Sequence, residues 1–464
     1  MIINGNNDTI AAICSGMTSS GISVIRISGD KAFEIADRIF NSVSGKTVGE
    51  MRQFSINYGF IADNIDEVLL LKMAAPHSYT KEDVIEIDCH GGIVVTRKIL
   101  DIILKNGARL AEPGEFTKRA YMNGRIDLSQ AEAVIDVINA KSELAAKNSV
   151  KQLKGNVKNR ISLIRDRILS KTAYIEAALD DPEHISLDGF SDELENEMKS
   201  VAVEVKKLIA SADDGRLINE GINTCILGLP NAGKSSLLNA LLNEERAIVT
   251  DIAGTTRDTL KETVVFGDVT LNIIDTAGIR ETDNIIEKIG VERAKKEADE
   301  ADLILYVVDS KNGILEEDKK LLEELKNKKL ILIHNKIDLC ADDISVYDKS
   351  TYDEDKSSAD SEIFLSSLTG EGVDELKEAI KDMFYTGAVY SDEDVIITNE
   401  RHKELLIKAS ASIENVIAGI ENGMSEDFLT IDMMDAYTFL GAITGESVED
   451  DLADRIFSDF CMGK

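Results

Sequence analysis

The first 120 residues combine short apolar runs with stretches of helical periodicity. Alternating or continuous apolar runs predict strands at 22–27, 67–73 and 83–88. Apolar residues spaced three or four apart predict helices at 32–40 and 94–105. Strands and helices mixed in this way, without regular alternation, predict a small α+β domain.

Helical periodicity then dominates from residue 129 to 179, a stretch that contains no proline. Ser129 with Glu132 three residues later predicts a capping box at its start. After Gly215 short β-branched runs alternate with helical stretches, which predicts a mostly parallel sheet covered by helices. The strands predicted there are 222–227, 263–266, 270–275, 303–309, 330–334 and 363–365, with helices at 234–242, 292–298, 317–325 and 373–384.

Helical periodicity returns after residue 385, at 400–420 and 427–439. Helical segments on both sides of an α/β region suggest insertion, because a compact domain with adjacent termini can be inserted into another at little cost. A tandem arrangement remains the alternative. The predicted fold class is a multidomain α/β + α protein. Its predicted domains are 1–120 (α+β), 121–215 (helical, first part), 216–384 (α/β) and 385–464 (helical, second part).

Composition limits the classes of function. The 464 residues include 52 Lys and Arg against 85 Asp and Glu, a net charge of −33, and residues 386–464 alone hold 5 basic against 17 acidic residues. A protein that grips nucleic acid with its own surface normally carries a basic stripe. The five cysteines form no CxxC pair, which favours a reducing compartment over a disulfide framework or zinc site. With no secretory signal or apolar span, we expect a cytoplasmic protein without membrane contact.

A phosphate-binding loop follows the predicted strand 222–227. The run from Gly228 to Ser235, GLPNAGKS, fits G-x-x-x-x-G-K-[ST] and precedes a predicted helix, as this motif requires. Its glycines let backbone N–H groups face phosphates, and the helix N-terminus adds its dipole. Lys234 would bridge the β- and γ-phosphates, and the Ser235 hydroxyl would bind Mg²⁺.

A second motif selects guanine. The strand 330–334 is followed by Asn335, Lys336, Ile337 and Asp338, which fit N-K-x-D. The Asp338 carboxylate can accept hydrogen bonds from guanine N1–H and the 2-amino group, whereas adenine would leave it unpaired at a cost. Ser366 and Ser367 follow the last strand, where a backbone N–H could meet the guanine O6.

Two switch-like loops lie between these motifs. Thr256 can give its hydroxyl to Mg²⁺, and Asp275 to Gly278, DTAG, can reach the metal and sense the γ-phosphate. Where Ras-like GTPases place a water-orienting Gln, this chain has Ile279, so another residue must act. Glu287 is one candidate carboxylate, although a solvated Glu on a helix face is the reading that spacing alone favours.

Four segments together make the chain similar to the MnmE (TrmE) family of tRNA-modification GTPases over its whole length. They are the P-loop with the run 248–258, the run 275–281 with Ile289-Gly290, the runs 113–120 and 127–133, and the chain end 460–464. The resemblance implies an N-terminal folate-binding domain, a helical domain and an inserted Ras-like P-loop GTPase domain. It also implies a homodimer formed through the N-terminal domains.

The resemblance further implies GTP hydrolysis that depends on potassium, with K⁺ neutralising charge between the β- and γ-phosphates. Asn231, Thr250, Ile252 and Thr255 would bind K⁺, Ser235 and Thr256 would bind Mg²⁺, and Glu287 would match the family's catalytic Glu. The complete set of expected nucleotide-site residues is Asn231, Ala232, Gly233, Lys234, Ser235, Ser236, Thr250, Asp251, Ile252, Ala253, Gly254, Thr255, Thr256, Asp275, Thr276, Ala277, Gly278, Asn335, Lys336, Asp338, Ser366 and Ser367.

The family acts with an FAD-containing partner, MnmG (GidA), in a heterotetramer that adds an aminomethyl or carboxymethylaminomethyl group to carbon 5 of the wobble uridine. The one-carbon unit would come from 5-formyl- or methylenetetrahydrofolate, and the matching folate contacts are Arg26, Glu86, Arg125 and Lys464. The acidic surface leads us to expect that the partner supplies most of the tRNA affinity. Cys461 matches a family cysteine with a candidate catalytic role, and a buried thiol is the alternative.

Departures from the family pattern are few. The loop 15–21 replaces a Pro/Gly/Arg-rich loop of the folate pocket, Arg125 stands where Lys is common, and Ser367 replaces an Ala. Two other classes of function compete: a ribosome-assembly GTPase and a GTP-controlled structural dimer. A ribosome-assembly GTPase normally carries a basic RNA-binding module, which this sequence lacks. A folate titration would test the structural dimer, because absence of folate binding would remove the one-carbon role.

Overall fold

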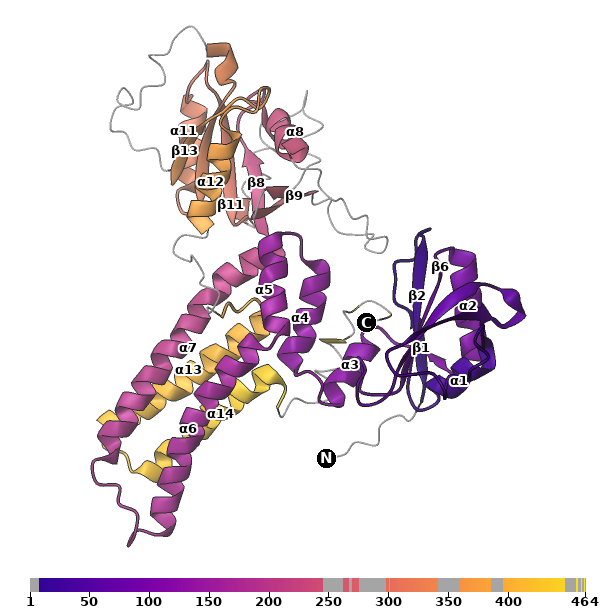
Figure 1. Cartoon of the computed structure of the whole chain (residues 1–464). Helices are drawn as coiled ribbons and strands as arrows, with labels where there is room; N and C mark the ends of the chain where they lie inside the picture. Colours follow the sequence, from indigo (N-terminus) through magenta and orange to yellow (C-terminus); the bar gives the residue numbers. More distant parts are fainter. Residues whose placement is uncertain are drawn as a thin grey trace. The chain divides into compact units, whose positions relative to one another are not determined.

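The computed structural model describes residues 8–244, 262–266, 269–274, 298–299, 301–340, 359–384, 395–446, 456–457, 460 and 463. The contacts between Cα atoms divide the chain into two compact units. The first consists of residues 1–138, 151–199 and 411–464, and the second of residues 139–150 and 200–410. Many of the elements of both units are labelled in Figure 1.

The first unit begins with a seven-stranded sheet in the order β3-β4-β5-β6-β2-β1-β7. Neighbouring strands are antiparallel except β1 and β7, which are parallel. The strands are β1 (Ile10–Ile13), β2 (Ile22–Ser28), β3 (Phe40–Ser42), β4 (Ile56–Ile61), β5 (Glu67–Met73), β6 (Val84–His90) and β7 (Arg109–Leu110).

Two helices cover one face of this sheet, α1 (Ala32–Ile39) and α2 (Ile93–Lys105). Their buried residues, Ile35 and Ile99 among them, share one apolar core with Ile25 of β2 and Ile87 of β6. Side chains alternate across a strand, so residues next to these, such as Arg26 and Glu86, belong to the opposite face.

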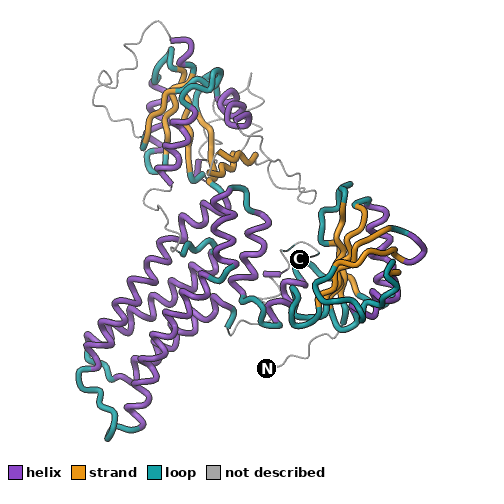
Figure 2. The backbone as a smooth tube through the Cα atoms, in the orientation of Figure 1, coloured by secondary structure: helices purple, strands orange, loops and turns teal. Residues whose placement is uncertain are grey.

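The rest of the first unit is mostly helical (Figure 2). Helices also begin and end the sequence of the second unit. They are α3 (Glu115–Met122), α4 (Leu128–Asn139), α5 (Glu143–Leu153), α6 (Asn156–Asp180), α7 (Phe190–Glu220), α13 (Glu400–Glu421) and α14 (Glu426–Thr444). Arg165 of α6 and Glu446 just past α14 form a two-bonded ion pair of 2.5 and 2.6 Å. This pair ties two segments that lie 281 residues apart in sequence.

The start of α4 differs from the prediction. The capping box uses Asp127 and Gln130 rather than Ser129 and Glu132: Gln130 N–H donates to Asp127 Oδ1 at 2.9 Å, and Asp127 N–H donates to Gln130 Oε1 at 3.1 Å. Asp is as good an N-cap as Ser, and both sets have the required spacing, so the sequence alone does not distinguish them.

The second unit contains a six-stranded sheet in the order β13-β12-β11-β8-β10-β9. All its pairs are parallel except β9 with β10, as expected from alternating strands and helices. The strands are β8 (Ile222–Leu227), β9 (Glu262–Phe266), β10 (Val269–Ile273), β11 (Leu303–Asp309), β12 (Leu330–Asn335) and β13 (Ser361–Phe364), with helices α8 (Lys234–Glu244), α11 (Glu316–Leu325) and α12 (Val373–Phe384).

The central strands of this sheet are buried along nearly their whole length. All six residues of β12 and the first six of β11 are removed from solvent, which is typical of parallel strands covered on both faces. Residues from β8, β11, β12, α8 and α12 form one apolar core. Because the core fixes the strands, their carboxyl ends present loops in a defined arrangement at one edge of the sheet.

Candidate nucleotide site

The candidate nucleotide-site residues of the described chain follow neighbouring parallel strands at their carboxyl ends. The P-loop follows β8, Asp309 ends β11, the N-K-x-D run ends β12 and continues beyond it, and Ser366 follows β13. In open α/β sheets ligands bind at this edge, because several loops converge there. The structure therefore brings together two motifs that lie about one hundred residues apart.

The P-loop adopts a conformation that requires positive φ angles. Asn231 has a φ of 63° and Gly233 a φ of 101°. A Cβ on Gly233 would lie 2.2 Å from Asn335 Nδ2, and one on Gly228 would lie 2.2 Å from the Val307 carbonyl oxygen. Glycine is thus required at both motif positions by close approach of neighbouring strands.

Lys234 begins α8 with its ammonium folded back over the loop. Its Nζ donates to the carbonyl oxygens of Gly228 at 2.8 Å and Leu229 at 3.0 Å. Burial lowers the pKa of Lys234, since removal from water disfavours the charged form. An anion at the loop would restore that lost solvation, so the position is suited to a phosphate.

Asn335 joins three loops through one buried side chain. Its Nδ2 donates to the Ala232 carbonyl at 3.1 Å, across to the P-loop. Its Oδ1 accepts from Ser367 N–H at 3.0 Å and from Ser367 Oγ at 2.9 Å. These bonds hold the N-K-x-D loop, the P-loop and the loop after β13 in fixed positions relative to one another.

Lys336 connects the same loops through its ammonium. Its backbone has a φ of 66°, uncommon for a residue with a side chain. Its Nζ donates to the Asn231 carbonyl at 2.6 Å and to Asp309 Oδ2 at 2.7 Å. Sequence reasoning does not select Asp309, because a lone Asp at the end of an apolar strand carries no motif.

Asp338 lies next to the loop after β13. Ser366 Oγ donates to its Oδ1 at 2.5 Å, and the same Oγ accepts from Leu368 N–H at 3.3 Å and Thr369 N–H at 3.2 Å. Ser366 is fully buried, so this contact fixes the carboxylate relative to the loop. Because each carboxylate oxygen can accept two hydrogen bonds, both oxygens of Asp338 can still accept from a base edge.

Several predicted residues lie outside the described part of the chain. They are Thr250, Asp251, Ile252, Ala253, Gly254, Thr255, Thr256, Asp275, Thr276, Ala277, Gly278, Glu287, Cys461 and Lys464. Ser235 and Ser236 are described and are exposed in the first turn of α8.

A second group of predicted residues meets on the first unit. Arg26 of β2 and Glu86 of β6 are direct cross-strand partners, and Arg26 Nε donates to Glu86 Oε1 at 2.8 Å. The Tyr79 ring contacts both Arg26 and Arg125, whose Cζ atoms lie 4.9 and 4.7 Å from its centroid. Sequence reasoning misses Tyr79, which has no spacing relation to either Arg.

Two glycines lie where the end of the chain closely approaches earlier residues of this unit. A Cβ on Gly463 would lie 2.4 Å from the Ile13 carbonyl oxygen, at the end of β1. Since Ala12 pairs with Arg26, this contact is close in the sheet to the Arg26–Glu86 pair. Gly114, with a φ of 68°, approaches Phe457 in the same way, because a Cβ there would lie 2.5 Å from that residue's carbonyl oxygen.

Comparison with known proteins identifies the family. Residues 9–125 match the family model described as GTP-binding protein TrmE N-terminus, and residues 128–461 match the MnmE helical domain. The tRNA modification GTPase MnmE of Lachnoclostridium phytofermentans is 54% identical over 461 residues, covering 98% of this chain and 99% of the relative. The chain belongs to the MnmE family. The MnmE of Clostridioides difficile is 46% identical over 469 residues, covering 99% of each.

Solved structures add little to this assignment. An Era variant from Aquifex aeolicus bound to GDP and AlF₄⁻ is 26% identical, covering 41% of this chain and 66% of that one, with a TM-score of 0.27. The G domain of the T. maritima FeoB iron transporter is 28% identical, covering 36% and 99%, with a TM-score of 0.25. These scores are too low to support a structural argument, and membership of the MnmE family rests on the full-length relatives.

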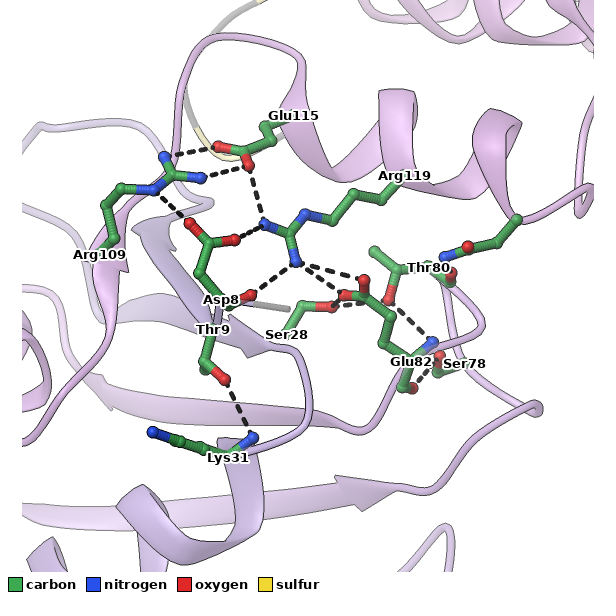
Figure 3. A network of polar contacts seen from close by, with 11 residues as sticks. Asp8, Thr9, Ser28, Lys31, Ser78, Thr80, Glu82, Arg109, Glu115 and Arg119 are labelled. Atoms are coloured by element: carbon green, nitrogen blue, oxygen red, sulfur yellow. Dashed lines mark hydrogen bonds and ion pairs between the residues drawn. The ribbon is translucent and has the colours of Figure 1, made fainter. Parts of the chain in front are cut away.

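Residues 113–120, one of the segments that resemble the MnmE family, supply two members of an ion-pair network. Arg119 of α3 donates to Asp8 Oδ1 at 2.7 Å, to Glu115 Oε1 at 2.9 Å and to Glu82 Oε1 at 3.2 Å. Arg109 donates to Asp8 at 2.7 Å and to Glu115 at 2.7 and 3.1 Å (Figure 3). This network attaches α3 to the sheet and so holds the segment that leads to Arg125.

The Asp8 and Glu115 carboxylates of this network remain ionised near neutral pH, because their pKa values are lowered. Burial alone would raise the pKa of Glu115, but hydrogen bonds from Arg109 and Arg119 outweigh it and lower that pKa. Burial likewise opposes the lowering of the Asp8 pKa by the same two guanidinium groups.

None of the described helices combines the length and apolar character needed to span a bilayer.

Proposed function

We propose that this chain hydrolyses GTP and uses that reaction in tRNA modification, as the names of its relatives state for them. The observation that carries the proposal is the convergence of the P-loop and the N-K-x-D loop through Asn335. A phosphate cradle and a guanine-selecting carboxylate joined in this way fit one guanine nucleotide and no adenine nucleotide. The remaining roles rest on the family resemblance.

The nucleotide would be held at both ends. Lys234 would exchange its carbonyl contacts for the β- and γ-phosphates, and the exposed Ser235 hydroxyl would bind Mg²⁺ together with Thr256. Asp338 would accept from the guanine edge. When bound, Mg²⁺ neutralises phosphate charge that develops during transfer.

Potassium dependence is the finer part of this proposal. Asn231, Thr250, Ile252 and Thr255 would bind K⁺, which supplies positive charge at the β–γ bridge. Asn231 fits this role because Lys336 engages its backbone carbonyl and its side chain is exposed on the P-loop. Glu287 would hold the attacking water indirectly. An E287A variant should keep GTP affinity and lose turnover, and lost binding would contradict this role.

The first unit would bind a tetrahydrofolate. Arg26 Nη1 is buried and has no hydrogen-bond partner within the described residues, which is costly unless a ligand completes it. Glu86 beside it can accept from a pterin ring N–H and amino group. Arg125 and Lys464 would contact other polar parts of 5-formyl- or methylenetetrahydrofolate. Cys461 is retained as a catalytic candidate of unassigned chemistry.

A homodimer would form through the open face of the seven-stranded sheet. Ile56 and Tyr58 of β4 and Leu69 of β5 are 65, 43 and 40% exposed, and Tyr58 pairs directly with Leu69. Contiguous exposed apolar side chains usually mark an interaction surface.

Within the assembly, an FAD-containing partner, MnmG, would complete a cytoplasmic heterotetramer and bind most of the tRNA. The proposed domain boundaries lie at residues 120, 215 and 384.

Two experiments test the proposed function. GTP turnover should be faster in KCl than in NaCl at equal ionic strength, and equal rates would exclude the potassium site. Mass analysis of tRNA from cells lacking the protein should show unmodified carbon 5 at the wobble uridine. Fully modified tRNA in those cells would contradict the tRNA role while leaving GTP hydrolysis intact.

A further inference from the structure

Asp309 lies between the P-loop and the N-K-x-D loop of the candidate nucleotide site. It is the last residue of β11, the strand between β8 and β12, and its side chain is only 18% exposed. Its Oδ1 accepts from Lys311 N–H at 2.9 Å, which fixes the carboxylate through an Asx turn. Its Oδ2 accepts from Lys336 Nζ at 2.7 Å.

Lys336 depends on outside contacts for its position. Its backbone lies in the left-handed region, which is unfavourable for a residue with a Cβ. A lysine side chain has several rotatable bonds, so its stem is defined only when its ammonium is held. Asp309 and the Asn231 carbonyl hold it from two loops, at 2.7 and 2.6 Å.

The charge of Asp309 suits this role. Burial alone would raise its pKa, but hydrogen bonds from Lys336 and from the Lys311 N–H outweigh burial and lower it. The carboxylate therefore stays ionised and forms a charge-assisted bond, which is stronger than a neutral one.

We propose that Asp309 is a positioning residue for guanine recognition: it holds the Lys336 ammonium so that the lysine stem forms one wall of the base pocket. Asp309 itself does not touch the nucleotide. The inference rests on the proposed GTP binding and adds a residue that lies outside the P-loop and N-K-x-D motifs. Because it acts at the base end, its loss weakens GDP and GTP equally.

The variant that tests this inference is D309N. Asn keeps an oxygen for the Lys311 N–H and so preserves the turn, but its neutral amide loses the charge-assisted bond to Lys336. We expect the Kd for GDP and for GTP to rise about tenfold, because such a bond is worth roughly 1.5 kcal/mol or more. The KM for GTP should rise by a similar factor, with kcat at saturating GTP changed less than about twofold.

Two controls separate positioning from general stability. D302A removes a carboxylate before the other end of β11, where Asp302 pairs with Arg216 at 2.9 Å, and should leave nucleotide affinity unchanged even if it lowers the melting temperature. In a K336A background, D309N should add less than about a twofold loss, because the two residues act as a unit.

The outcomes are distinguishable. Wild-type protein that binds no guanine nucleotide would remove the proposed function itself. Wild-type binding with unchanged D309N affinity would overturn only the role of Asp309. A full additional loss in the K336A background, or an equal loss in D302A, would assign Asp309 a structural role instead.

Discussion

At the scale of single residues, the proposed preference for guanine depends on one carboxylate. Asp338 is held by the buried Ser366 hydroxyl, so both of its carboxylate oxygens have defined positions. A fixed acceptor pair matches a base with two adjacent donors and penalises a base without them. Guanine has those donors, whereas xanthine presents an oxygen at position 2.

We therefore predict that D338N reverses the preference of the site. An amide can donate to the xanthine oxygen but cannot accept both guanine donors. The Kd for GTP should rise about a hundredfold, while that for xanthosine triphosphate should fall. Competition binding with both nucleotides on the same protein measures the ratio. Weakening of both nucleotides together would indicate a damaged loop rather than changed recognition.

The Arg26 guanidinium sets the second residue-scale prediction. R26M keeps an unbranched stem beside Tyr79 and Phe116 but removes the charge and the unpaired Nη1. Affinity for 5-formyltetrahydrofolate should fall at least about tenfold, with GDP affinity unchanged. Isothermal titration with each ligand measures both, and R52M, at an exposed arginine, is the matched control. Unchanged folate affinity would remove Arg26 from the pocket.

The sequence could predict site residues wherever the chemistry imposes a spacing. The P-loop and N-K-x-D residues are recognisable because each motif is local. Asp309 and Tyr79 are not, since they join their sites only through the pairing of distant strands. The family resemblance supplied Arg26 and Glu86, and the structure adds that they are cross-strand partners.

At the scale of secondary-structure elements, ion pairs add to the buried apolar contact of Phe116 in attaching α3 to the sheet. Glu115 and Arg119 lie one helical turn apart on α3, and each pairs outside the helix. Removing one member of a buried ion pair costs about 3 kcal/mol, because the other charge remains unpaired.

This network predicts a loss of stability in acid. The folded-state pKa values of Asp8 and Glu115 are lowered, so their contribution is fully present above the unfolded values near 4 and is lost as pH falls through the lower folded values. Urea unfolding of the first unit should therefore show decreasing stability below about pH 4. E115Q should be less stable at pH 7 and show a shallower decrease. An identical pH slope in E115Q would exclude Glu115 as a cause.

Elements with strong periodicity are those that the sequence predicts well. The strand expected at 222–227 and the helices expected at 400–420 and 427–439 correspond to β8, α13 and α14. The strands β1, β3, β4 and β7 escape prediction, because they are short or carry many small and polar residues. The strand expected at 363–365 begins two residues earlier, as β13, since pairing with β12 decides its register.

At the scale of the whole molecule, the proposed homodimer rests on the open sheet face of the first unit. We predict that L69K, which places a charge among Ile56 and Tyr58, yields monomers at concentrations where the wild type is dimeric. Leu69 is 40% exposed, so the monomer fold should be retained, as circular dichroism can check. Sedimentation velocity measures the mass. A dimer of unchanged affinity would place the interface elsewhere.

Asn335 has a thermodynamic consequence. Its bonds to Ala232 and Ser367 bring together loops that are more than one hundred residues apart in sequence, so the nucleotide site is complete only when the whole α/β sheet has folded. A ligand that binds only the folded state stabilises it by mass action, by about 2.7 kcal/mol at one hundred times its Kd. A cell's guanine nucleotide pool would therefore act as a folding ligand for the second unit alone. The first unit, which carries the folate candidates, would depend on its own ion pairs and core for stability.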